Sequence, residues 1–408
     1  MKVLHVNSSD GSGGAAIAAY RLHKGLISQG IDSRLLVGSS HSGGDRTAVI
    51  PRQRKLEMLI GRLTWNLGFN DFNCINSFKI PDQPFYKEAD ILNFHNLHGG
   101  YFNYLALPKI TEKKPAIFTL HDMWSFTGHC IYSDDCDRWQ TGCGKCPYPD
   151  TYPSIRRDIT HIEWSLKRKT YASSNLVIVT LSKWLTDLAQ KSILNTLPIH
   201  HIPNGIDTEI YQPLDPDLCR TVLNIPTGKK VLMFGAQSLS DPRKGGDLLI
   251  QALKKLPESL KADTILLTFG GGNIKDPELL EMKIIDLGYI SSDRLKVIAY
   301  SAADLFIFPT RADNLPLVLQ ESMACGTPMV SFEIGGVPDL VRPLTTGYLA
   351  KPEDAKDMAD GIVQLLEDND LREAMGQQCR VIAMQEYSLE LQAQRYIDLY
   401  RKTLLDRL

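Results

Sequence analysis

Short apolar runs alternate with segments of helical spacing along the first half of this chain. The runs lie at residues 3–6, 33–38, 89–95, 116–121 and 175–182. The first run leads into the glycine-rich sequence NSSDGSGG, and residues 15–30 then repeat apolar positions every three or four residues. Strands that alternate with helices in this way predict a parallel sheet with helical crossovers.

A second series of the same kind follows a turn-rich segment at residues 201–213, which is typical of a domain junction. Its strand-like runs lie at 229–236, 264–272, 295–298, 303–309 and 327–332. Its helical segments lie at 244–256, 315–326, 355–368 and, as one long stretch, 371–405. We therefore expect an α/β fold of two doubly wound, Rossmann-like domains, 1–205 and 206–385, and a last helix at 386–408 that crosses back to the first domain.

The composition is that of a globular chain. Its 408 residues are 43% hydrophobic, which is enough for two cores. The formal charge of −2 gives no overall attraction to nucleic acid. Because no apolar run reaches the roughly 18 residues of a membrane span and no leader-like start is present, we expect a cytoplasmic protein.

Two doubly wound domains are expected to present the carboxyl ends of their strands to one cleft, which suits a nucleotide sugar. Its diphosphate requires backbone N–H groups at helix N-termini and cations, while its hydroxyl groups require carboxylates. Gly13 and Gly14 follow the first strand, Arg243 and Lys244 follow a strand of the second domain, and Gly271 lies in FGGG after another. Glycine loops and basic helix starts are also common as purely structural features.

The densest polar signal is the stretch RADNLPLVLQESMACGTP, in which Asp313 precedes Glu321 by eight positions. Carboxylates that face each other on one regular helix lie three or four positions apart. We expect Asp313 in the loop before a helix and Glu321 two turns inside it, so that the two contact separate parts of one extended ligand. The alternative is an ordinary helix start with an Asp or Asn N-cap.

In this combination and order, these features resemble the family 4 glycosyltransferases, which are retaining enzymes with the GT-B fold. The shared sequences are GSGGAA, TLHD at 119–122, IPNGID at 202–207, DPRKG at 241–245, FGGG, ADLFIFPT and the stretch ending in SMACGTPMV, and they span nearly the whole chain. The resemblance implies a hexosyltransferase that uses a UDP- or GDP-linked sugar, a glycan or glycolipid acceptor in polysaccharide biosynthesis, and no catalytic metal.

The resemblance also implies a role for each matched residue. The implied catalytic residues are His121 at the transferred sugar, Lys244 at the diphosphate and Asp313 at the sugar hydroxyl groups. The implied donor-binding residues also include Gly13, Gly14, Arg243, Gly271, Ile290 of the base-contacting LGYI at 287–290, Leu315, Leu317, Val318, and Glu321 at the ribose.

This chain departs from the family pattern in three ways. Asp313 stands where the family usually has Glu, and Pro316 stands where it has Gly and therefore lacks a backbone donor. Gln237 and Ser238 follow the strand after which many members place an Arg. Our hypothesis is that Arg243 supplies the missing charge.

Retention of configuration requires either a covalent nucleophile or attack on the face that the leaving phosphate occupies. The sequence identifies no nucleophile, and the resemblance favours the same-face route, in which catalysis is positioning and electrostatic stabilisation. His121 is then a sugar-orienting group, although a His that follows an apolar strand is often structural. His95 and His98 are weaker candidates for the acceptor side.

Four cysteines lie close together within a segment at 129–150 that interrupts the first domain. They are Cys130, Cys136, Cys143 and Cys146, and the last two have the Cys-x2-Cys spacing of zinc ligands. We expect a structural zinc site with no catalytic role. Two disulfides or four free thiols are the alternatives.

The segment PRQRKLEMLIGRLTWNLG at 51–68 mixes basic and apolar residues. It predicts either a peripheral contact with an anionic membrane that delivers a lipid-linked acceptor, or a helix that packs its apolar side inward.

Other functions of the same two-domain form fit the sequence less well. A nucleotide-sugar-binding or epimerising protein remains an alternative. A dinucleotide-dependent oxidoreductase predicts the G-x-G-x-x-G fingerprint, which is absent.

Overall fold

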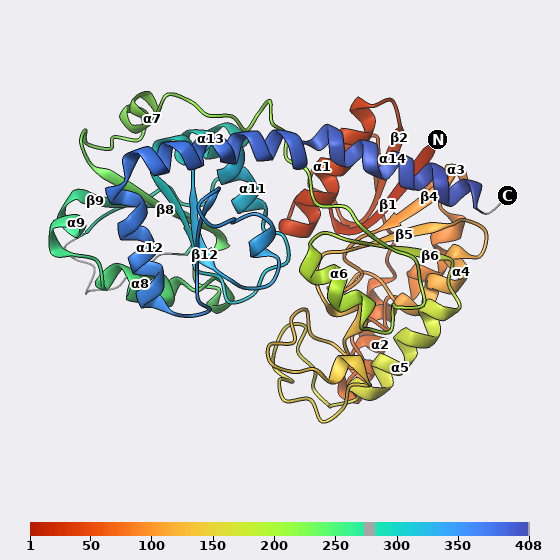
Figure 1. Ribbon diagram of the computed structural model, residues 1–408. Coiled ribbons are helices and arrows are strands. Elements are labelled where there is room, and N and C mark those ends of the chain that lie inside the picture. Colours follow the sequence, from red (N-terminus) through yellow and green to blue (C-terminus); the bar gives the residue numbers. More distant parts are fainter. Residues whose placement is uncertain (273–281, 407–408) are drawn as a thin grey trace. The chain divides into compact units, whose positions relative to one another are not determined.

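The computed structural model describes residues 1–272 and 282–406, which divide into two compact units. The first unit contains Met1–Gly205 together with Glu390–Leu408, and the second contains Ile206–Leu389. Figure 1 labels the helices and strands of both. Among the described residues, no helix is long and apolar enough to cross a lipid bilayer.

The first unit is built on a seven-stranded parallel sheet with the strand order β3-β2-β1-β4-β5-β6-β7. Its strands are β1 (Lys2–Ser9), β2 (Asp32–Ser39), β3 (Thr47–Val49), β4 (Ile91–Phe94), β5 (Ala116–Leu120), β6 (Leu176–Thr180) and β7 (Ile199–His201). The chain winds outward from β1 in both directions, which is the doubly wound arrangement. The carboxyl ends of all these strands therefore lie at one edge of the sheet.

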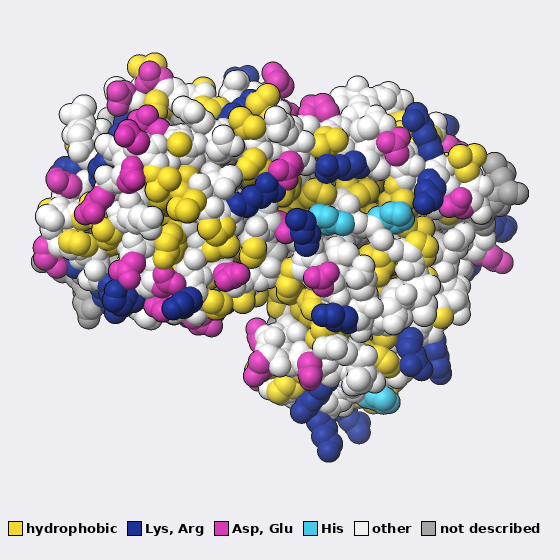
Figure 2. Space-filling view, viewed as in Figure 1, with side chains coloured by type: hydrophobic (Ala, Val, Ile, Leu, Met, Phe, Trp, Pro, Cys, Tyr) yellow, Lys and Arg dark blue, Asp and Glu magenta, His cyan; other side chains and the backbone are white. Residues whose placement is uncertain are grey.

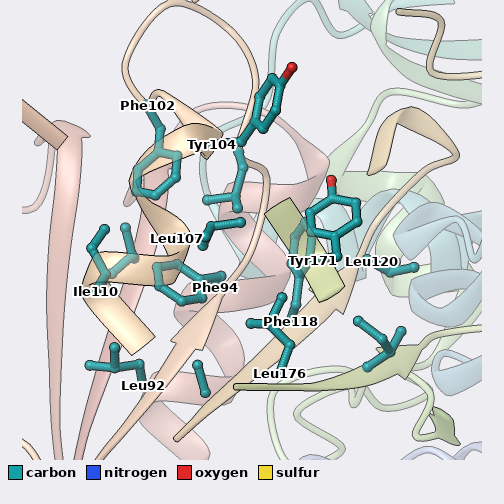
Figure 3. Close-up of a cluster of buried hydrophobic side chains, with 14 of the residues drawn as sticks. Leu92, Phe94, Phe102, Tyr104, Leu107, Ile110, Phe118, Leu120, Tyr171 and Leu176 are labelled. Carbon is teal, nitrogen blue, oxygen red and sulfur yellow. The ribbon is translucent and has the colours of Figure 1, made fainter. Parts of the chain in front are cut away.

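Helices cover both faces of this sheet. The helices of this unit are α1 (Gly14–Ser28), α2 (Arg54–Leu67), α3 (Pro84–Glu88), α4 (Leu107–Thr111), α5 (Thr160–Ala172), α6 (Lys183–Gln190) and α14 (Leu389–Leu405), with short 3-10 turns between them. One face forms an aromatic-rich core that includes Phe94, Phe118 and Tyr171, shown as sticks in Figure 3. Burial of these side chains is the main stabilisation of this face.

The last helix, α14, packs on the other face of the same sheet. Tyr396 and Tyr400 are buried there beside β1, β4 and β5 residues. The hydroxyl of Tyr396 lies 3.0 Å from Thr119 Oγ1, and Asn93 donates to the hydroxyl of Tyr400 over 2.8 Å. The prediction that the last helix returns to the first domain is confirmed, and its blue ribbon lies beside the red and orange strands in Figure 1.

The single helix predicted over 371–405 is wrong, because the chain forms α13 (Asn369–Glu386) and then α14. The backbone between them pairs with Ile206 instead of continuing the helix. Ile206 N donates to Tyr387 O over 2.8 Å, and Leu389 N donates to Ile206 O over 2.9 Å. The break therefore lies at the point where the chain leaves the second unit and enters the first again.

The second unit has a six-stranded parallel sheet with the order β10-β9-β8-β11-β12-β13. Its strands are β8 (Lys230–Ser238), β9 (Thr264–Gly271), β10 (Lys283–Asp286), β11 (Leu305–Phe308), β12 (Met329–Phe332) and β13 (Gly347–Ala350). Its other helices are α7 (Pro216–Val222), α8 (Gly246–Lys254), α9 (Glu258–Asp263), α10 (Asp293–Ala302), α11 (Leu317–Ala324) and α12 (Ala355–Glu367). Two doubly wound sheets therefore confirm the predicted fold class.

Residues 295–298 are not the predicted strand but the middle of α10. The apolar run LKVI is too short to distinguish the two states by periodicity. In the folded chain Val297 and Tyr300, one helical turn apart, are buried, while Lys296 extends toward α11. The strand at this edge of the sheet is instead the short β10.

Candidate active site

A partly buried ion pair lies at the carboxyl edge of the second sheet. Lys244, just after β8, places its Nζ 2.5 Å from Oδ2 of Asp313, which lies in the loop between β11 and α11. Arg243 Nη1 lies 3.5 Å from the same oxygen and donates to Ala312 O over 2.9 Å. Burial alone would raise the pKa of Asp313, but Lys244 and then Arg243 outweigh it and hold the pKa below its ordinary value.

Two glycines allow this approach of the loops. Gly245 has a φ of +70°, and a Cβ there would lie 1.8 Å from Pro309 O at the end of β11. Gly335 has a φ of +54°, and its Cβ would lie 2.2 Å from Asp313 O. Both conformations are ones that glycine adopts without steric cost. The loop positions of Lys244 and Asp313 thus depend on residues far apart in the sequence.

The structure places Asp313 before α11 and Glu321 at the fifth residue of that helix, which is somewhat nearer its start than the two turns expected. Glu321 is buried, accepts from the hydroxyl of Tyr300 over 3.2 Å, and lies 3.7 Å from Lys296 Nζ. The two carboxylates therefore have different partners, and Glu321 is held by α10.

The remaining donor-side candidates lie on the same edge or beside it. Gly271 ends β9, and the LGYI loop that contains Ile290 follows β10, with Gly288 O accepting from Gly270 N over 2.8 Å. Leu315 is buried before α11, while Leu317 and Val318 begin that helix. N–H groups in the first turn of a helix have no partner within the helix, so this turn suits an anion.

In the first unit, Gly13 and Gly14 lie at the carboxyl edge, where β1 leads into α1. Gly13 precedes the helix with a φ of +92°, and Gly14 is the first helical residue. Asp10 in the same loop accepts four hydrogen bonds from Ser40, His41 and Ser42. These four hydrogen bonds fix the loop and occupy the acceptor sites of the carboxylate.

His5 in β1, His95 just after β4 and His121 just after β5 form a hydrogen-bonded row, in which His5 and His95 are buried and His121 is partly exposed. His5 Nδ1 lies 2.9 Å from His95 Nε2, and His95 Nδ1 lies 3.1 Å from His121 Nε2. Burial lowers the pKa of His121 to about 4 and lowers the pKa of His5 and His95 well below the ordinary value. The row is therefore neutral at pH 7, and the tautomer of His121 is coupled to that of His95.

A pocket of about 470 Å³ lies in the first unit. We call it the Asp71 pocket. Its lining residues are Gly61, Thr64, Trp65, Phe69, Asn70, Asp71, Asn73, Gly99, Tyr152, Pro153 and Ser154. The ring of Tyr152 meets that of His98 edge-on at 5.8 Å, and His98 Nε2 lies 3.0 Å from Asp122, the neighbour of His121. The pocket combines aromatic rings with polar groups, as sugar-sized ligands require.

The four clustered cysteines lie in loops between β5 and α5, and none forms a disulfide. Burial raises the pKa of Cys130 to about 12 and that of Cys143 to about 11. Cys146 Sγ lies 3.2 Å from His129 Nε2. Within residues 1–272 and 282–406, no three His, Cys, Asp or Glu side chains are grouped to hold a metal ion, and the zinc site stays a prediction.

The loops of this cysteine-rich segment show acidic and basic side chains on the surface visible in Figure 2, at the lower part of the first unit.

A buried lysine anchors the start of the segment. Lys167 on α5 donates to Trp124 O over 2.6 Å and to Thr127 O over 3.0 Å. These two hydrogen bonds to carbonyl oxygens replace bonds to water and so compensate for the burial of the ammonium group.

Two doubly wound units, with a basic pair and carboxylates at a carboxyl edge, define the class of GT-B enzymes. Comparisons with known proteins are in agreement. The model of the family described as Glycosyltransferase Family 4 matches residues 12–210, and that described as Glycosyl transferases group 1 matches residues 218–381. The chain belongs to the group 1/family 4 glycosyltransferases and is a glycosyltransferase.

Curated relatives fall within the same group. WcaC of Escherichia coli K12, a glycosyl transferase assigned to colanic acid biosynthesis, is 27% identical over 81% of this chain and 83% of its own length. The D-inositol 3-phosphate glycosyltransferase of Mycolicibacterium smegmatis is 31% identical, over 40% of this chain and 38% of that enzyme.

Solved structures share the fold at low identity. The sucrose-phosphate synthase of Thermosynechococcus elongatus aligns with a TM-score of 0.73 and 17% identity over 100% of both chains. Anabaena HepE in complex with UDP aligns with a TM-score of 0.71 and 16% identity, over 98% of this chain and 100% of that one.

Sequence reasoning did not find His5 or Gly335. His5 lies inside an apolar strand, where a histidine is usually structural. Gly335 lies 22 positions after Asp313 in the sequence, and only the fold brings the two together. No local motif marks either residue.

Proposed function

We propose that this glycosyltransferase transfers a hexose, with retention of configuration, from a UDP- or GDP-linked sugar to a glycan or glycolipid in polysaccharide biosynthesis, in the cytoplasm. The observation that carries the proposal is the Lys244–Asp313 pair, with Arg243 beside it, at the carboxyl edge of a doubly wound sheet. Support for the donor comes from HepE, whose structures contain UDP and UDP-glucose. Support for the pathway comes from WcaC, whose name assigns it to colanic acid biosynthesis.

In the proposed donor complex, the diphosphate replaces Asp313 as the ion-pair partner of Lys244. Lys244 then neutralises the leaving phosphate, and Asp313 is released to accept hydrogen bonds from sugar hydroxyl groups. Arg243 adds a second cation, and the first turn of α11 adds the N–H groups of Leu317 and Val318. Because these groups supply the positive charge, the proposal invokes no catalytic metal. Glu321 is assigned to the ribose.

In the proposed reaction, the bond between the anomeric carbon and the diphosphate oxygen breaks. The acceptor oxygen bonds to that carbon on the same face, and its proton passes to the leaving diphosphate. A histidine with a pKa of about 4 is a weak base at neutral pH, which supports a sugar-orienting role for His121 over a general-base role. The carboxylate of Asp122 accepts from His98 and from Trp124 N, which disfavours it as a nucleophile.

The Asp71 pocket supports an acceptor that contains sugar units. Aromatic rings such as Trp65 and Tyr152 stack on the apolar faces of sugars, while Asp71 and Asn70 can bond hydroxyl groups. A peripheral contact with the inner face of a membrane, through α2, would bring a lipid-linked acceptor to this pocket.

The test is hydrolysis and transfer with a panel of UDP-, GDP- and ADP-sugars, with and without candidate acceptors. We expect nucleotide release from one donor and, by NMR of the product, the same anomeric configuration in donor and product. Inverted product would refute retention. Tight donor binding without release would favour the alternative of a nucleotide-sugar-binding protein, and a changed sugar still attached to nucleotide would favour an epimerase.

A further inference from the structure

Helix α2 presents its apolar side to solvent, contrary to the expectation that an ordinary domain helix packs that side inward. Leu56, Leu59, Leu63 and Leu67 are all exposed, and their spacing of three, four and four residues puts them on one side of the helix. Glu57 is the only buried residue of α2. The pattern is the reverse of that for a surface helix, whose apolar stripe faces the core.

The polar side of α2 contacts the rest of the first unit through Asn73, whose Nδ2 donates to Glu57 O over 3.2 Å. The buried Glu57 side chain accepts from Arg52 Nε over 2.7 Å, a local bond just before the helix start. Gly61, one turn further, lies against the Asn73 side chain, and Gly68 ends the helix with a φ of +94°. The leucine stripe is therefore fixed outward by contacts on the opposite side.

Lys55 and Arg62 border one side of the stripe, whereas Arg54 lies on the opposite side of the helix. Arg54, Lys55 and Arg62 are exposed, and α2 contains no acidic residue other than the buried Glu57. In the part of the chain that the structure describes, no ion pair is recorded for these three cations. On a helical wheel, Lys55 and Arg62 lie directly beside Leu59. Exposed leucines bordered by cations complement a bilayer with anionic headgroups.

We propose that the leucine stripe and flanking cations of α2 form a docking surface for an anionic lipid bilayer. The leucines enter the boundary between headgroups and acyl chains, while Lys55 and Arg62 contact the anionic headgroups. The opposite side of the same helix lines the Asp71 pocket through Gly61, Thr64 and Trp65, so docking places this pocket next to the lipid surface. A second copy of the chain is a poorer occupant, because a symmetric pairing of the stripe brings the cations beside it close to the same cations of the other copy, where like charges repel.

The test is co-sedimentation with equimolar phosphatidylglycerol–phosphatidylcholine vesicles and with phosphatidylcholine vesicles. We expect the full chain to bind the anionic vesicles more strongly than the neutral ones. The double variant Leu59→Ser/Leu63→Ser should weaken binding by about tenfold or more. Lys55→Glu/Arg62→Glu should abolish the preference for anionic vesicles and its dependence on salt.

The matched control is Leu218→Ser/Val222→Ser on α7 of the second unit. Leu59 and Leu63 are 67% and 64% exposed, and Leu218 and Val222 are 67% and 63% exposed, so the control removes equally exposed apolar groups. It should bind vesicles like the unmodified chain. Thermal unfolding of each variant checks that the fold is intact, since none of these side chains is buried.

Absence of vesicle binding by the unmodified chain overturns the inference, as does unchanged binding by Leu59→Ser/Leu63→Ser. A concentration-dependent dimer that this variant loses, without vesicle binding, would show that a second copy occupies the stripe. Sedimentation does not depend on catalysis. Vesicle binding without sugar transfer would therefore support this inference and refute the proposed function.

Discussion

Replacing Lys244 with Met tests the proposed donor site directly. Met preserves most of the length of the side chain and removes its charge. In the folded chain Nζ lies 2.5 Å from Asp313, and the two side chains are only 16% and 13% exposed, so the charge acts with little screening by solvent. A hydrogen bond to a charged group contributes about 1.5–3 kcal/mol, which corresponds to a loss of roughly 10–150-fold in donor affinity or in kcat/KM.

The assay is titration calorimetry with UDP and GDP, followed by the rate of nucleotide release from the donor identified in the panel. Lys244→Arg should retain part of the affinity, because the positive charge remains. Lys356→Met is the control, since Lys356 is exposed on α12 and pairs only with Asp360 in the described residues. Thermal unfolding separates loss of binding from loss of fold. If Lys244→Met bound and released nucleotide like the unmodified chain, the assignment of the diphosphate to this pair would be wrong.

Four further changes probe other parts of the structure. Arg243→Ala should weaken nucleotide binding by less than Lys244→Met, because Arg243 lies 3.5 Å from Asp313 and is 31% exposed; unchanged affinity would remove it from the site. His95→Ala should lower kcat more than the donor KM by freeing the His121 ring, while His95→Gln should restore part of the rate; equal loss in both variants would contradict a positioning role. The free energy of unfolding should fall as the pH is lowered from about 6.5 toward 4. His23 and His121 have pKa values of about 4 in the folded chain, so the unfolded chain binds more protons in that window, and each histidine lowers the free energy of unfolding by up to about 3 kcal/mol. His23→Asn should flatten this pH dependence, measured by urea unfolding. Metal analysis should find one zinc ion per chain in the purified protein and none in the variant Cys143→Ser/Cys146→Ser. Zinc-free protein with four titratable thiols in the cluster would favour the free-thiol alternative.

The strand and helix pattern was largely predictable because each element carries its own periodicity. Alternating apolar runs gave most strands of both sheets, and the long amphipathic stretches gave α8, α11 and α12. The errors fall where neighbours decide the conformation. LKVI joins α10 because Val297 and Tyr300 face the core together, and the last helix breaks where residues 387–389 pair with Ile206.

The candidate site was predictable where one motif contains its residues. The spacing between Asp313 and Glu321 correctly indicated a loop residue and a helix residue. The histidine row was not predictable, because His5 lies in β1 while His95 and His121 follow β4 and β5, and the three meet only when these strands pair side by side. The orientation of α2 was also undetermined, since its amphipathic pattern fits a buried stripe as well as an exposed one. The burial of Glu57 and its contact with Asn73 distinguish the two.

The departures of this chain from the family pattern have physical consequences that partly offset one another. Asp313 is one methylene shorter than Glu, yet it reaches Lys244 because Gly335 lets its loop approach closely. Pro316 lacks an N–H, but it lies at the N-cap of α11 with a φ of −68°, a backbone angle that the proline ring already favours. The first-turn N–H groups of Leu317 and Val318 then remain for an anion. We therefore expect Pro316→Gly to change donor affinity by less than Gly335→Ala, because the first adds a donor to a formed site whereas the second displaces Asp313 itself.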